Sequence, residues 1–127
     1  MVFTSDLVME FSGKVIKGKG RGKVLGFPTI NLETETKLDS GIFICKTKIF
    51  DKDYFGLLHV GPRPVFGEED FSVEIYLLNF ENGKIPEELN IEFVKFLRKV
   101  KNFENIQELI MQMEKDKKEA MKFIRGG

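Results

Sequence analysis

The chain has 127 residues and a mass of 14.6 kDa, the size of one domain that buries about two-thirds of its unfolded surface. Basic and acidic side chains each number 20, so the net charge is zero and argues against a general attraction for nucleic acid or anionic membranes. The single cysteine, Cys45, excludes a disulfide framework within the chain and a cysteine-based zinc site. Without a basic, apolar start or a bilayer-length apolar run, the chain is expected to be cytoplasmic.

Short segments with alternating side chains predict a mainly β domain. The predicted strands span residues 11–17, 29–32, 41–50, 54–60, 72–80 and 91–97. Residues 51–53 are expected to form a turn. Residues 61–70 hold two prolines and two glycines and are expected to be a loop with the acidic residues 68–70 in solvent. Five or six short antiparallel strands of this kind suggest a closed Greek-key barrel, because closure leaves no exposed strand edge.

The alternation predicts which side chains share a face of each strand. In residues 41–50, one face holds Phe43, Cys45 and Ile49. In residues 72–80, one face holds Val73, Ile75 and Leu77, and the other holds Glu74, Tyr76, Leu78 and Phe80. In residues 91–97, the shared side holds Ile91, Phe93 and Leu97. Glu74 is therefore a carboxylate on a largely apolar face.

A C-terminal helix is predicted over residues 106–124. Asn105 is a suitable N-cap, and Glu108 follows three residues later, which is close to a capping box. One apolar stripe recurs at helical spacing, formed by Ile106, Leu109, Ile110, Met113, Ala120, Phe123 and Ile124. We interpret this stripe as core packing against the barrel, rather than a face for a partner, and the charges of residues 115–118 as a solvated face.

The segment from residue 18 to residue 31 reads G-K-G-R-G-K-V-L-G-F-P-T-I-N. Glycines let the backbone approach a ligand closely, and the interspersed basic side chains add positive charge, so the segment suits phosphate oxygens. Thr29 and Asn31 then offer two neutral oxygens on one face of an extended segment, suited to a hard cation such as Mg²⁺. Taken as pattern alone, such a run is more often a surface hairpin loop, and neither the P-loop nor the dinucleotide motif matches.

Two other residues have competing interpretations. Burial on an apolar face would raise the pKa of Glu74 toward that of a useful general base, but Glu74 could equally pair with a lysine at a barrel mouth. His59 is the lone histidine and lies in an apolar strand. With no Ser-His-Asp arrangement evident, it is expected to be a hydrogen-bonded structural residue.

The string G-K-G-R-G-K-V-L-G-F-P-T-I-N-L resembles the signature of the riboflavin kinase family, G-x-G-R-x-L-G-x-P-T-A-N. Further matching segments follow in the family's order at residues 41–43, 60–66, 73–78, 96–98 and 103, so the resemblance covers residues 11–120. It implies a six-stranded antiparallel barrel with a C-terminal helix. It also implies transfer of the ATP γ-phosphate to the 5'-hydroxyl of riboflavin, with Mg²⁺ or another divalent metal, to give FMN and ADP.

The resemblance also implies roles for individual residues. Glu74 would accept the proton of the riboflavin hydroxyl, and Thr29 and Asn31 would serve the metal and the phosphates. The implied ATP site comprises Gly18, Lys19, Gly20, Arg21, Gly22, Lys23, Pro28, Thr29, Asn31, Gly61 and Pro62. The implied flavin site comprises Glu74, Arg98 and Phe103.

The chain departs from the family's pattern at three places. Asn79 replaces the aspartate of Leu-Leu-Asp-Phe, residues 84–86 read Lys-Ile-Pro where the family has Leu-Tyr-Gly, and Ile30 replaces the alanine of P-T-A-N. None of these is the expected base or a metal ligand, but they bear on the flavin-side contacts. A catalytically weak or inactive flavin- or nucleotide-binding module of the same fold therefore stays an alternative.

The remaining expectations concern partners and organisation. An RNA-binding barrel using residues 14–23 is disfavoured by the zero net charge. We expect a monomer that binds riboflavin and ATP, without a nucleic acid or membrane partner. Residues 1–10 are expected to be an extension ahead of a domain over residues 11–127. Bacterial members of the family usually carry a preceding adenylyltransferase domain, which this sequence does not encode, so the expected product is FMN.

Overall fold

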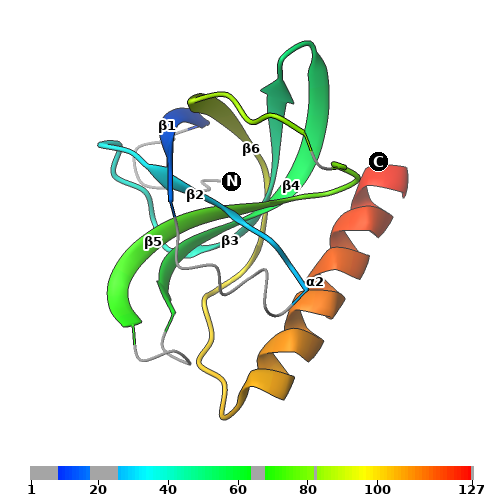
Figure 1. Cartoon of the computed structure of the whole chain (residues 1–127). Helices are drawn as coiled ribbons and strands as arrows, with labels where there is room; N and C mark the ends of the chain where they lie inside the picture. The colour runs from blue at the N-terminus through cyan, green and yellow to red at the C-terminus, as the bar shows by residue number, and fades with distance from the viewer. Residues whose placement is uncertain (1–8, 18–25, 64–67, 82, 127) are drawn as a thin grey trace.

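Six strands form a closed antiparallel barrel, and a C-terminal helix packs against its outer face in the computed structural model, which describes residues 9–17, 26–63, 68–81 and 83–126 (Figure 1). The elements are β1 (Glu10–Ile16), β2 (Ile30–Glu33), β3 (Gly41–Ile49), β4 (Lys52–Arg63), β5 (Glu68–Leu77), β6 (Glu88–Arg98) and α2 (Ile106–Gly126). Around the barrel the order is β1-β2-β5-β4-β3-β6, with β6 returning to β1. The predicted fold class is confirmed.

The barrel interior is filled by side chains that alternate inward along the strands. Phe43 lies at its centre, with its ring 5.0 Å from that of Phe93 and 5.5 Å from that of Phe96, both in edge-to-face geometry. Cys45 is fully buried in the same core, and desolvation by burial raises the pKa of its thiol. Phe43, Cys45 and Ile49 therefore share one face, as predicted, and it is the inner face of the barrel.

A second apolar layer lies between the outer face of the barrel and α2. Its buried residues are Ile44, Leu78 and Ala120, with partly buried neighbours that include Tyr76, Leu97 and Ile124. Asn105 caps the helix, because its Oδ1 accepts from the Glu108 N–H at 2.9 Å. No helix in the described ranges is both long and apolar enough to cross a membrane.

Not every member of the predicted apolar stripe is core. Leu109 and Ala120 are buried, whereas Ile106 is 41% exposed and Phe123 is 36% exposed. The stripe prediction is wrong for these last two residues, because one side of the helix faces the barrel and both of them lie at its margin. The Lys95 Nζ atom lies 4.9 Å from the centre of the Phe123 ring.

The β3–β4 turn and the β4–β5 connection differ from their predicted positions. Ile49 pairs with Lys52, so the β3–β4 turn is formed by Phe50 and Asp51 rather than by residues 51–53. The residue at its first position, Phe50, has φ of 55°. Residues 61–70 are not one long loop, since β4 continues to Arg63 and β5 begins at Glu68. A register shift between Gly61 and Arg63 lets the strand continue past its glycine and proline.

Irregular pairing also changes two predicted faces. Residues Phe93, Lys95, Phe96 and Arg98 of β6 pair with four consecutive residues of β3, so the β6 ladder contains two bulges. Each bulge adds one residue and reverses the alternation. Leu97 follows the first bulge, between Phe93 and Lys95, and lies within the second, between Phe96 and Arg98, so one reversal applies to it. Leu97 therefore packs under α2, and the prediction that it faces the same way as Ile91 and Phe93 is wrong.

The end of β5 differs from the prediction as well. The strand ends at Leu77, and Asn79 takes a left-handed conformation with φ of 59°, which asparagine tolerates better than most residues. The chain turns there, so Phe80 packs against the barrel interior, with its ring 5.1 Å from that of Tyr54. The prediction that Phe80 shares the face of Glu74 is wrong.

Close approach of β4 to β5 makes Gly56 a sensitive position. A Cβ there would lie 2.9 Å from both Ile75 Cγ1 and the Tyr76 carbonyl oxygen, so the strands would have to move apart. We expect Gly56→Ala to lower the free energy of unfolding by about 1–3 kcal/mol, measured by urea denaturation followed by circular dichroism. Gly126→Ala is the control, because a Cβ at Gly126 has nothing within 4 Å. Equal stabilities for the two variants would contradict the predicted clash.

Candidate functional site

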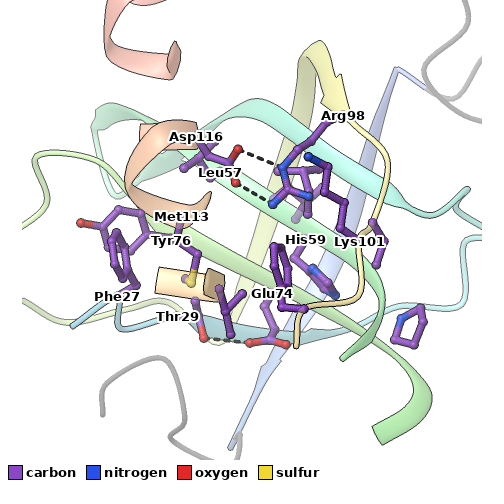
Figure 2. Close-up of a pocket in the computed structure, with 16 residues that line it drawn as sticks. Phe27, Thr29, Leu57, His59, Glu74, Tyr76, Arg98, Lys101, Met113 and Asp116 are labelled. Atoms are coloured by element: carbon purple, nitrogen blue, oxygen red, sulfur yellow. Dashed lines mark hydrogen bonds and ion pairs between the residues drawn. The ribbon is translucent and has the colours of Figure 1, made fainter. Parts of the chain in front are cut away.

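A pocket opens between the outer face of the barrel, the N-terminal half of α2 and the segment that follows β6 (Figure 2). About 630 Å³ of space not filled by atoms lies within it, with the solvent at its open mouth included. One wall is apolar and includes Phe27, Ile42, Leu57, Tyr76, Leu109 and Met113. The polar lining groups include Thr29, His59, Glu74, Arg98, Lys101 and Asp116. A large apolar wall with a few convergent polar groups is suited to a small ligand that has an apolar body and a few polar groups.

Glu74 is held at the pocket by two hydroxyl groups. Thr29 Oγ1 donates to Glu74 Oε1 at 3.0 Å, and Ser72 Oγ donates to Glu74 Oε2 at 2.8 Å. Thr29 precedes β2, whereas Ser72 and Glu74 lie two residues apart on β5 and so share a face. Each carboxylate oxygen therefore accepts a hydrogen bond from a different segment of the chain, which fixes the orientation of the carboxylate. Figure 2 shows the hydrogen bond from Thr29.

Strand pairing brings the predicted metal ligands to the same place. Asn31 on β2 lies directly opposite Glu74 on β5, and Thr29 is two residues before Asn31. The hydroxyl proton of Thr29 is used by Glu74, which leaves its oxygen lone pairs as acceptors. The Thr29 hydroxyl and the Asn31 amide oxygen are hard oxygen donors that fit Mg²⁺.

The rest of the coordination sphere would have to come from outside this set. In the described ranges, no three His, Cys, Asp or Glu side chains gather to hold a metal ion. Mg²⁺ keeps about six ligands and commonly takes phosphate oxygens from a bound nucleotide. These residues therefore fit a shared site for a metal and phosphates better than a metal cage made by protein alone.

Arg98 and Asp116 form a buried ion pair at the opposite side of the pocket. Arg98 Nε donates to Asp116 Oδ1 at 2.9 Å, and Arg98 Nη2 donates to Asp116 Oδ2 at 2.7 Å (Figure 2). Gln112 Nε2 also donates to Asp116 Oδ1, at 3.0 Å, and Lys101 Nζ donates to Gln112 Oε1, at 3.4 Å. This network ties the end of β6 and the following segment to α2.

Asp116 was missed by the sequence interpretation. It is only 5% exposed, so the prediction that residues 115–118 form a solvated face is wrong for this residue. The sequence does indicate that Asp116 lies on the buried face of the helix. Leu109, Met113, Asp116 and Ala120 follow one another by four, three and four residues, which is helical spacing. A charge within an apolar stripe needs a buried partner, and the partner here is Arg98.

The other predicted site residues fall into three groups. Pro62 and Phe103 line the pocket with Arg98, and Gly61 lies next to it on β4. Pro28 is exposed and is not among the lining residues. Residues 18–23, which were predicted to bind the ATP phosphates, lie outside the described residues. His59 is 8% exposed, and its Nε2 is 3.0 Å from the Gly61 carbonyl oxygen, as expected for a hydrogen-bonded structural histidine.

Comparison with known proteins identifies the family. The family model described as riboflavin kinase matches residues 6–124. The chain belongs to the riboflavin kinase family. The sequence resemblance that predicted this membership is confirmed, and the closed barrel with a C-terminal helix is the family's fold.

Curated members of the family differ in length from this chain. A bifunctional riboflavin kinase/FMN adenylyltransferase of Bacillus subtilis is 33% identical over 88% of this chain, which spans 37% of that relative. Human riboflavin kinase is 29% identical over 87% of this chain, and the match covers 77% of the human protein. The chain thus corresponds to one part of the bifunctional protein and to most of the human one.

A solved structure resembles the fold. The crystal structure of a protein described as a macrolide-efflux protein from Streptococcus pneumoniae superposes with a TM-score of 0.76 at 22% identity, covering 88% of this chain and 38% of that one. At this identity the likeness concerns the fold alone.

The buried ion pair gives a stability prediction. Asp116→Leu removes the acceptor of an Arg98 side chain that is only 16% exposed, and leaves its charge without its partner. We expect the free energy of unfolding to fall by about 3–5 kcal/mol in urea denaturation. In the double variant Arg98→Met/Asp116→Leu, which removes both charges, we expect at least about half of this loss to be recovered. A double variant as unstable as the single one would contradict the electrostatic explanation.

Proposed function

We propose that this chain is an ATP-dependent riboflavin kinase that transfers the γ-phosphoryl group of ATP to the 5'-hydroxyl of riboflavin, giving FMN and ADP. The observation that carries the proposal is the Glu74 carboxylate, oriented by two hydroxyl donors at a pocket with an apolar wall. Membership of the riboflavin kinase family supports the choice of reaction and substrate.

Phosphoryl transfer needs little covalent chemistry from the protein, so positioning and charge stabilisation do most of the work. In the proposed complex the flavin ring lies against the apolar wall, where Phe27 and Tyr76 meet edge to face with ring centres 5.4 Å apart. The ribityl chain then extends toward Glu74. The 5'-hydroxyl oxygen attacks the γ-phosphorus, its proton passes to Glu74, and the bond from that phosphorus to ADP breaks.

Thr29 and Asn31 are the proposed ligands of a divalent metal, with Mg²⁺ the first choice. The bound metal would neutralise charge on the phosphates that meet there. Residues 18–23, Gly61 and Pro62 are proposed to bind the nucleotide, while Arg98 and Phe103 belong to the flavin side. The proposal also places the protein in the cytoplasm as a monomer.

The main test compares riboflavin phosphorylation by the wild-type chain and by Glu74→Gln, which keeps the shape of the side chain but cannot accept the proton in the same way. We expect FMN formation by the wild type, and a kcat lower by about 100-fold or more for Glu74→Gln. The measurement is chromatographic separation of riboflavin, FMN and FAD after incubation with ATP and Mg²⁺. Glu92→Gln is the matched control, since Glu92 is exposed on β6.

Two results would overturn parts of this proposal. A wild-type chain that binds riboflavin, seen by quenching of its fluorescence, but forms no FMN would be a binding module of the same fold. Full activity of Glu74→Gln would remove Glu74 from the role of base while leaving the kinase assignment intact.

The Thr29 hydroxyl gives a second test, of the metal site. Thr29→Val has the same shape but no oxygen, whereas Thr29→Ser keeps the oxygen. We expect Thr29→Val to need about tenfold more Mg²⁺ for half-maximal rate, and Thr29→Ser to stay within about threefold of wild type. Rates measured across a Mg²⁺ titration at saturating ATP and riboflavin decide this. Identical Mg²⁺ dependence in both variants would argue against Thr29 as a ligand.

A further inference from the structure

Ser72 has one hydroxyl proton and two acceptors within reach. Its Oγ lies 2.8 Å from Glu74 Oε2 and 3.3 Å from the Gly61 carbonyl oxygen. The shorter contact is to a carboxylate, and hydrogen bonds to ionised acceptors are the stronger ones. The Ser72 proton therefore lies on the Glu74 side while Glu74 is ionised, and the Gly61 carbonyl is the second acceptor.

The Gly61 carbonyl is fixed by the backbone rather than placed by chance. Gly61 has φ of 137°, in the region that favours glycine, and a Cβ there would lie 3.1 Å from Val100 Cγ2 and 3.2 Å from Ser40 Cβ. His59 Nε2 lies 3.0 Å from the same carbonyl oxygen. The β4 register shift follows directly after Gly61. Gly61 is also the direct cross-strand partner of Ser72 in the β4–β5 ladder, so its carbonyl oxygen lies within reach of the Ser72 hydroxyl.

From this arrangement we infer that Ser72 is a positioning residue for Glu74, and that its hydroxyl turns from Glu74 toward the Gly61 carbonyl when Glu74 takes up the substrate proton. The inference rests on the proposed kinase function. The proton that arrives on Glu74 comes from the riboflavin hydroxyl. The Ser72 proton stays on Ser72 and only changes direction, so no charge or proton is left over.

The Ser72 hydroxyl can stabilise both the ionised and the protonated form of Glu74. Before transfer, Ser72 donates to Oε2 while Thr29 donates to Oε1, so the carboxylate cannot rotate about its terminal bond. After transfer, the Ser72 oxygen can accept from the new Glu74 O–H, since its own proton has a waiting acceptor in Gly61. A hydroxyl that serves as donor and then as acceptor avoids an unpaired polar group at either stage.

The test uses a matched pair, Ser72→Thr and Ser72→Val, which add the same bulk and differ only in the hydroxyl. We expect Ser72→Thr to keep kcat within about threefold of wild type. For Ser72→Val we expect kcat to be lower by about 10- to 100-fold, with the KM for riboflavin and for ATP changed by less than about threefold. Melting temperatures of the two variants serve as the check on folding, and Ser72→Ala replaces Ser72→Val if the latter does not fold.

A second arm separates positioning of Glu74 from a general structural role. If Ser72 acts through Glu74, the double variant Ser72→Val/Glu74→Gln should be no more than about twofold slower than Glu74→Gln alone. A full additional loss in that background, or equal kcat for Ser72→Thr and Ser72→Val, would overturn the inference while leaving the kinase function standing. A wild-type chain that forms no FMN would overturn the proposed function and this inference together.

Discussion

The pairing of β2 with β5 holds the barrel closed and assembles the polar centre of the pocket at the same time. β2 has only four residues, yet it is the link between β1 and β5, and the other five strands would otherwise form an open sheet. Its inward side chains, Ile30 and Leu32, pack into the barrel core. The Ile30 side chain, which replaces the alanine of the family's motif, is thus accommodated inside the barrel. Burial of an apolar side chain of this size contributes about 2 kcal/mol, so a register slip that turned it outward would be disfavoured. Correct packing inside therefore sets Asn31 opposite Glu74 outside.

The helix completes the site from the other side. The barrel has an inner core of its own, whereas the outer face of β3, β4, β5 and β6 is apolar where α2 covers it. The Arg98–Asp116 pair lies at this junction and also borders the pocket. A buried ion pair is a poor source of stability compared with apolar packing, but it tolerates few alternative arrangements. Its value here is in fixing where the segment after β6 lies against α2.

Regular features of the fold could be predicted from local pattern, and irregular ones could not. Alternation in residues 41–50 and 72–80 showed which side chains share a face and put Glu74 opposite Ile75 and its neighbours, because period-two patterns depend only on the strand itself. Which of the two faces is the inner one came from the structure. The predicted face of Leu97 failed because the bulges in β6 arise from its pairing with β3, a partner about 50 residues away along the chain. The prediction that Asp116 is solvated was wrong for a related reason. Its partner Arg98 lies on β6, and the sequence of the helix does not show that Arg98 lies beside it. Thr29 and Asn31 were singled out by type and spacing, but their approach to Glu74 depends on strand order.

The most instructive failure is the segment after Val60. Glycine and proline there predicted a loop, because both weaken a regular strand. In the fold, β4 continues through them by way of a bulge, and Gly61 adopts a conformation that other residues rarely take. The regular pairing of the strand is interrupted there. The Gly61 carbonyl oxygen lies within hydrogen-bond distance of both His59 and Ser72. Sites of this kind are where local rules are expected to fail, because the chain departs from its preferred geometry to hold a functional group in place. Gly61, whose presence predicted a loop, thus supplies the carbonyl oxygen beside the Ser72 hydroxyl that holds Glu74.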